Sequence, residues 1–122
     1  MRNKKLKIII KSAAQIRAEI SSALKGKSKG IQKENEVVFY NVESFVQILT
    51  KNRIEILLFL NQNKPGSIYA LAKSLGRDFK NVHADVKKLA ELSFIDLEPA
   101  GTARNGLVPK AKYSGLELSL VS

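Results

Sequence analysis

The chain has 122 residues, enough for one compact domain with an additional arm, and its composition is that of a folded globular protein, 44% hydrophobic and 26% charged. The absence of cysteine excludes disulfide scaffolds, thiolate metal sites and cysteine nucleophiles. No apolar run approaches the roughly 20 residues that a membrane span needs, so we expect a cytoplasmic protein without a membrane anchor.

The charge is strongly basic and unevenly distributed. The chain carries 21 Lys and Arg against 11 Asp and Glu, a formal charge of +10. Residues 1–30 hold most of this excess, with Glu19 as the single acidic residue among them. A small protein with this balance is attracted to polyanions, and nucleic acid is the default candidate partner.

Apolar residues at three- and four-residue spacing predict an amphipathic helix over residues 6–25, with a basic outer face. The stripe consists of Leu6, Ile9, Ala13, Ile16, Ile20 and Leu24. Gly26 and Gly30 end this helix in a linker, so residues 1–36 form a basic helical arm in this interpretation. Because the stripe must be buried, we expect it to pack on the same helix of a second copy, which makes the protein a homodimer.

The next elements are marked by their caps. The run Val37–Tyr40 predicts a short strand, and Asn41 can cap a helix that contains Phe45. Thr50 can cap the following helix, which ends at the sequence Asn63-Lys64-Pro65-Gly66 because proline and glycine do not continue it.

A helix-turn-helix pattern with a wing follows. Ser67 can cap a short helix over 68–75, Gly76 supplies the positive φ of a sharp turn, and Asp78 can cap a second helix over 79–92. A strand over 94–98, a loop over 99–106 and a strand over 115–121 then read as the wing. The predicted fold class is mainly α with a small β wing (α+β), a winged helix-turn-helix domain over residues 37–122.

From Val37 to Leu120 the chain resembles a family of small prokaryotic winged helix-turn-helix proteins regarded as transcriptional regulators, broadly akin to MarR- and ArsR-type folds. The block from Gly76 to Leu89 carries most of the resemblance, together with Leu49–Arg53 and Ser67–Ala72. Family members commonly have glycine where this chain has Ser93, and a basic residue at the position of Ala84. Some relatives look like antitoxins, which implies a cognate protein partner as an alternative role.

The resemblance implies a recognition helix over about 79–92 in the major groove and a wing over about 94–120 on the DNA backbone. Within it, Arg77, Lys80, Asn81, His83 and Lys87 carry the DNA-reading role, and Asn81 can bond adenine through its amide. On a helical wheel Asp85 falls beside the core face, so it is expected either to brace a neighbouring arginine or to cap instead of contacting DNA, and Tyr69 and Phe79 are expected to pack in the core. The full set of candidate DNA-binding residues is Ser67, Tyr69, Arg77, Lys80, Asn81, His83, Ala84, Lys87, Lys88 and Arg104.

No catalytic, metal or cofactor site is expected. His83 is the single histidine and has no second ligand at metal-binding spacing, and no nucleophile or phosphate-loop motif occurs. Three functions remain open: a dimeric, sequence-specific regulator that binds double-stranded DNA, an antitoxin-like protein that binds a toxin and represses its own operon, and a winged helix that binds RNA.

Overall fold

The computed structural model describes residues 4–26, 34–101 and 106–121, and in them the chain is a mixed α+β protein with five helices and two small sheets. These elements belong to two compact units. Unit 1 comprises Thr50–Ser114, and unit 2 comprises Lys4–Leu49 together with the segment that begins at Gly115. None of the described helices is both long and apolar enough to cross a lipid bilayer.

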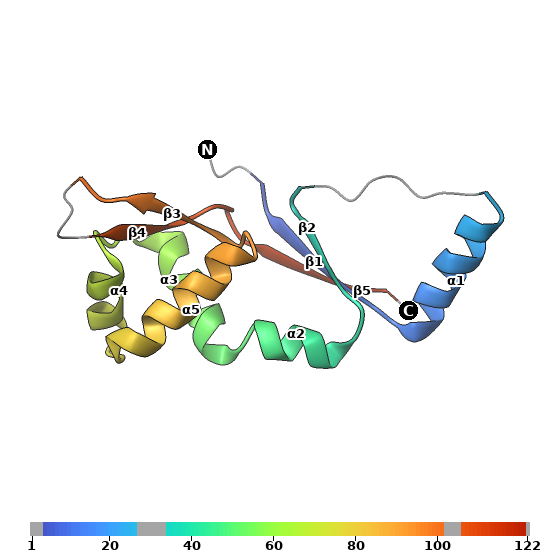
Figure 1. Ribbon diagram of the computed structural model, residues 1–122, viewed down its shortest axis with the longest axis horizontal. Helices are drawn as coiled ribbons and strands as arrows, with labels where there is room; N and C mark the ends of the chain where they lie inside the picture. The colour runs from blue at the N-terminus through green and yellow to red at the C-terminus, as the bar shows by residue number, and fades with distance from the viewer. Residues whose placement is uncertain (1–3, 27–33, 102–105, 122) are drawn as a thin grey trace. The chain divides into compact units, whose positions relative to one another are not determined.

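Unit 2 is built on a parallel sheet of three strands in the order β2-β1-β5 (Figure 1). The strands are β1 (Leu6–Lys11), β2 (Glu36–Phe39) and β5 (Leu116–Val121). Strand β1 is central, and its Leu6, Ile8 and Ile10 are buried while the residues between them are partly exposed. This two-residue alternation is what a strand with one buried face requires.

The segment over residues 6–11 was expected to be helical, and that expectation is wrong. Leu6 and Ile9 fit helical spacing, but the run Ile8-Ile9-Ile10 is β-branched and favours an extended backbone. Pairing with β2 and β5 decides between the two, and these partners lie far away in the sequence. The helix itself, α1 (Ala13–Leu24), begins later, where the Ser12 hydroxyl accepts a hydrogen bond from the Gln15 N–H at 3.1 Å.

The first 36 residues are therefore not a separate helical arm. Strand β2 pairs with β1, and α2 (Val42–Ile48) contacts β2, so the boundary of unit 2 falls after Leu49 instead of at residue 36. No residue of α1 is buried, and Ile20 and Leu24 are exposed. The apolar stripe that was expected along one helix is divided between a strand and a helix.

Unit 1 contains three helices and a hairpin (Figure 1). The helices are α3 (Lys51–Gln62), α4 (Ile68–Leu75) and α5 (Phe79–Glu91), and the antiparallel hairpin consists of β3 (Ile95–Pro99) and β4 (Leu107–Ala111). The predicted N-caps are confirmed: the side chains of Thr50, Ser67 and Asp78 each accept a hydrogen bond from the backbone N–H three residues later. In unit 2, Asn41 caps α2 in the same way.

The hairpin differs from the expected wing in its second strand. Residues 115–121 do form a strand, β5, but it pairs with β1, and the partner of β3 is β4. Strand β4 was missed because Pro109 interrupts its sequence, and proline is a poor signal for a strand. Pro109 stands opposite Leu97 and is fully buried, so packing outweighs its weak strand propensity.

Candidate functional site

The candidate site is centred on α4, α5 and the turn between them. Gly76 ends α4 with a φ of 67°, a left-handed conformation that glycine adopts without a steric penalty. On α5 the inner face is formed by Val82, Val86 and Leu89, all with no exposed surface. This burial fixes the rotation of α5 about its axis and so determines which side chains face outward.

The outer face of α5 is polar and basic. Lys80, Asn81, Ala84 and Lys87 are exposed, and Lys88 is partly exposed beside them. Glu91 is the exposed acidic residue of the helix, since Asp85 is turned toward α3. The sequence analysis had named the four lysine and asparagine side chains and Ala84 as candidates. The structure brings these five residues together along one side of a single helix.

Arg77 is placed differently from the other candidates. Its guanidinium donates to a carboxylate oxygen of Glu55 at 2.9 Å and to the Asn52 carbonyl at 3.2 Å, both on α3. Its side chain is only 18% exposed. Arg77 therefore ties the turn to α3, and its charge is already engaged within unit 1.

Asp85 braces an arginine, which is one of the two roles expected of it. Its carboxylate accepts a hydrogen bond from Nε of Arg53 at 3.1 Å, and the two side chains are 18% and 19% exposed. Charge-assisted hydrogen bonds of this kind are stronger than neutral ones. The pair links α5 to α3 at the side of the helix that faces the interior.

Three aromatic side chains form a row beside the outer face of α5. The ring centroids of Tyr69 and Phe79 are 6.2 Å apart, and those of Phe79 and His83 are 5.5 Å apart. Tyr69 is 64% exposed and Phe79 is 44% exposed, so the expectation that both pack in the core is wrong. Phe79 is the first residue of α5, where the interior can no longer cover it.

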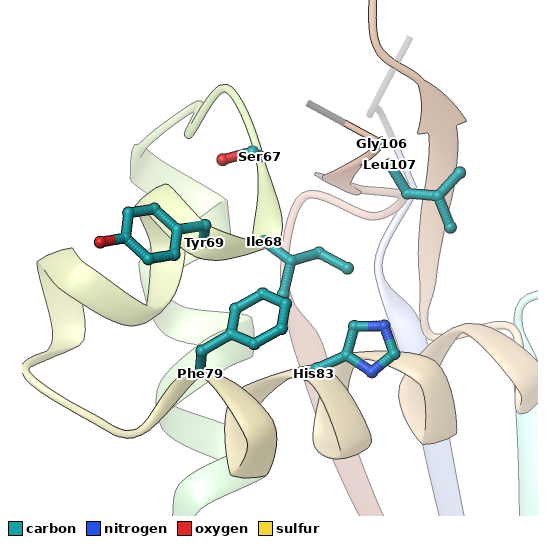
Figure 2. Close-up of a pocket in the computed structure, with 7 residues that line it drawn as sticks. All are labelled: Ser67, Ile68, Tyr69, Phe79, His83, Gly106 and Leu107. Atoms are coloured by element: carbon teal, nitrogen blue, oxygen red, sulfur yellow. The ribbon is translucent and has the colours of Figure 1, made fainter. Parts of the chain in front are cut away.

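This row borders an open hollow of about 670 Å³ between the helices and the hairpin. Figure 2 shows Phe79 and His83 rising from α5 on one side, Ile68 and Tyr69 on α4, and Leu107 across the opening. Ser67 and Gly106 complete the lining. Sequence reasoning recognised Ser67, Tyr69 and His83 as site residues but missed Phe79, Ile68 and Leu107. No sequence signal marked Phe79 as a site residue, because its helical position is that of a core residue.

The hairpin contributes less defined chemistry. Lys110 lies on β4 and pairs with Glu98 on β3 at 3.3 Å, in an exposed position where such a pair is weak. Arg104, the remaining candidate, lies outside the described residues. Within the described ranges, no group of three or more His, Asp or Glu side chains is arranged to hold a metal ion.

Comparison with known proteins identifies the family of the chain. No curated protein and no solved structure matches the chain significantly. A family model does match, over residues 48–118, which is more than half of the chain and includes α3, α4, α5 and both strands of the hairpin. The chain therefore belongs to the HVO_A0114 family.

Proposed function

We propose that this protein is a sequence-specific regulator that binds double-stranded DNA through a winged helix-turn-helix. Helix α5 is the recognition helix and enters the major groove, and the β3–β4 hairpin is the wing that contacts the DNA backbone. Helix α5 has 13 residues and is about 20 Å long. The major groove of B-DNA is about 12 Å wide, which is enough to admit a helix.

The observation that carries this proposal is the division of α5 into two faces. One face is completely buried and holds the helix rigidly, and the other presents Lys80, Asn81, Ala84 and Lys87 to solvent. Lysine contacts phosphate without regard to sequence, and asparagine can read the edge of adenine. A rigid helix with both kinds of side chain on one exposed face has what duplex recognition needs.

The aromatic row supports the same function. Phe79 is the first residue of α5, and the ring of Tyr69 on α4 lies beside it. Recognition helices contact base edges with their first residues. An exposed phenyl ring can contact the methyl group of thymine, which a lysine cannot recognise. Apolar and polar readers of base edges would then act side by side.

A binding selection with random duplex DNA, followed by a salt titration of the selected site, tests the proposal. Phosphate contacts by Lys80, Lys87 and Lys88 alone correspond to a log–log salt slope of about −2.7 on B-DNA. We expect a selected sequence that is bound at low salt and steeply weakened toward physiological salt. Double-stranded RNA and single-stranded DNA of the same sequence are the controls.

Two results would overturn the proposal. One is the absence of binding to any duplex DNA at low salt. The other is equal or tighter binding to double-stranded RNA, which would transfer the basic face to an RNA-binding function.

A further inference from the structure

Strand β5 leaves one edge of the parallel sheet open. On the side of β5 that faces β1, the carbonyls of Gly115 and Val121 accept hydrogen bonds from the N–H groups of Leu6 and Ser12, both at 2.9 Å. In a strand, alternate residues direct their N–H and C=O groups to the same side. Leu116, Leu118 and Leu120 therefore direct theirs away from β1, and in the described part of the chain no strand pairs with that side.

The side chains of these three leucines are also uncovered. They are 41%, 56% and 74% exposed in sequence order. Their register partners on β1 are Leu6, Ile8 and Ile10, which are at most 7% exposed. Register partners in a parallel sheet share a face, so the apolar face of β1 continues onto β5 and reaches the open edge.

Such an edge is unusual for a protein that remains a monomer. Natural edge strands are commonly protected by lysine, proline or a bulge, which prevent pairing with another strand. Strand β5 has the sequence Leu-Glu-Leu-Ser-Leu-Val and contains neither lysine nor proline, and its pairing with β1 runs without a break from Leu116 to Val121. Its backbone and its side chains both present a surface that fits another strand.

We propose that β5 is a dimerisation edge, where a second copy of the chain pairs its own β5 in the antiparallel direction. A two-fold axis perpendicular to the sheet passes beside Leu118, so that Leu118 lies opposite the partner's Leu118. Leu116 then lies opposite the partner's Leu120. The two three-stranded sheets become one continuous sheet with all six leucines on the same face.

Backbone geometry favours a second copy as the occupant. Leu116, Leu118 and Leu120 are the residues whose N–H and C=O groups point outward, and in this register they face the same groups of the other copy. The seam gains roughly six hydrogen bonds, because each outward residue exchanges both of its groups with the residue opposite.

Charge fixes the register further. With Leu118 on the axis, Glu117 lies opposite the partner's Ser119, and the two glutamates avoid each other. A register with Glu117 on the axis would place two like charges directly opposite, which destabilises a strand pair. The register with Leu118 on the axis therefore pairs all three outward leucines and keeps the two glutamates apart.

The seam is short, and this limits its strength. Six residues per chain bury less than the roughly 800 Å² per partner of a standard interface. We therefore expect dimers that dissociate on dilution, with a Kd on the order of micromolar. Light scattering and sedimentation of the full chain over a concentration series should show this exchange.

A lysine substitution at the axis tests the interface. Leu118→Lys places two like charges opposite each other and should raise the dimer Kd at least about tenfold. Leu58→Lys is the matched control, because Leu58 is a comparably exposed leucine, 65%, on α3. Circular dichroism verifies that both variants are folded. An unchanged Kd for Leu118→Lys, or a wild-type chain that is monomeric at all concentrations, overturns the inference.

Single cysteines test the register without adding charge, since the chain has no cysteine of its own. Opposite residues in a hydrogen-bonded antiparallel pair have Cα atoms about 5.5 Å apart, within reach of a disulfide. Leu118→Cys should therefore form a disulfide-linked dimer under mild oxidation. Leu116→Cys should not do so alone, but should cross-link when mixed with Leu120→Cys.

The following outcomes would contradict the proposed interface, and they can be distinguished from a failure of the proposed function. Efficient cross-linking of Leu116→Cys alone, or cross-linking of Leu118→Cys no faster than that of Leu58→Cys, contradicts the proposed edge. A monomeric chain that still binds duplex DNA would overturn this inference and leave the proposed function in place.

Discussion

Ser93 is the residue at which the backbone departs most from ordinary preferences. It has a φ of 65°, the single positive φ of a non-glycine residue in the described chain. The turn that it makes is closed by two bonds, from the Ser93 N–H to the Ala90 carbonyl at 3.0 Å and from the Phe94 N–H to the Leu89 carbonyl at 2.9 Å. These are the two bonds of a Schellman motif, in which glycine is the usual residue.

We expect Ser93→Gly to stabilise the protein by about 1 kcal/mol. The left-handed conformation costs a residue with a side chain roughly 1–2 kcal/mol, and Ser93→Gly removes this cost. The greater freedom of glycine in the unfolded chain offsets part of the stabilisation. Urea denaturation followed by circular dichroism measures the change. A destabilised variant would mean that the serine hydroxyl contributes more than the backbone conformation costs.

Gly76 provides the matched control, because it ends α4 with the same motif. The Arg77 N–H bonds the Ala72 carbonyl at 3.0 Å and the Gly76 N–H bonds the Lys73 carbonyl at 3.2 Å. A Cβ atom added at Gly76 would meet no atom within 4 Å, so Gly76→Ser tests the backbone conformation alone. It should destabilise the protein by about 1 kcal/mol, opposite in sign to Ser93→Gly.

Asn81 and Lys87 share the outer face of α5 but are expected to contribute differently to binding. Asn81→Ala should cost about 1–3 kcal/mol on the selected site and relax the preference at one base pair. Lys87→Ala should weaken binding to all sequences about equally, because phosphate contacts position the protein without specifying a base. Competition binding with single-base variants of the site distinguishes the two. A uniform loss in both variants would remove Asn81 from the base-reading residues.

Residue by residue, the outer face of α5 was predictable and its aromatic border was not. Lys80, Asn81 and Lys87 follow from the helical period alone, once the buried residues are identified. Phe79 shares the inner side of a helical wheel with Val86 and Leu89, yet 44% of its surface is exposed. The wheel gives the direction of a side chain and contains no information on how far the core extends along the helix.

At the scale of elements, α3 and the turn before α5 are held together by Arg77. We expect Arg77→Ala to lower the free energy of unfolding by about 1–2 kcal/mol, since it removes hydrogen bonds to Glu55 and to the Asn52 carbonyl. The salt slope of DNA binding should be unchanged. Lys80, three residues away and exposed, provides the opposite case.

Lys80→Ala should reduce the steepness of the salt slope by about 0.9, the contribution of one phosphate contact, and leave stability nearly unchanged. The pair of variants compares two basic side chains at the start of the same helix. If Arg77→Ala also reduces the slope, Arg77 contacts the backbone of the DNA in addition to α3.

Elements with a clear local signal were predicted well, including β2 and β5 as strands, but the pairing between strands was not. The caps Thr50, Ser67 and Asp78 lie within four residues of the N–H groups they satisfy, so the sequence contains the whole interaction. Strand β1 depends on residues 36–39 and 116–121, and β4 depends on β3. No periodicity within Leu6–Lys11 or Leu107–Ala111 contains that information.

For the whole molecule, the position of β1 changes what removal of the amino-terminal segment should do. If residues 1–36 were a separate arm, deletion of residues 1–30 would leave a folded monomeric domain. Because the deletion removes the central strand, β2 and β5 would lose the strand that both pair with. We expect loss of the parallel sheet and exposure of Phe39, seen as reduced ellipticity and as aggregation.

A deletion that leaves ellipticity per residue and solubility unchanged would contradict this expectation. Substitution of one buried residue of β1, Ile8→Asp, is a milder form of the same experiment. It places a charge on the buried face of the central strand and should lower the unfolding free energy by roughly 3 kcal/mol or more.

The pairing of Leu6 with Leu116, far apart in the sequence, also has a consequence for folding. The segment Thr50–Ser114 of unit 1 lies in sequence between β1 and β5, so its own contacts are more local than those of the parallel sheet. Long loops are slow to close, and their entropy must be lost before the contacts at their ends compensate for it. During synthesis, β1 is made before unit 1, and its second partner, residues 116–121, is made after unit 1. We therefore expect unit 1 to fold before the parallel sheet is complete, because its contacts are the more local ones.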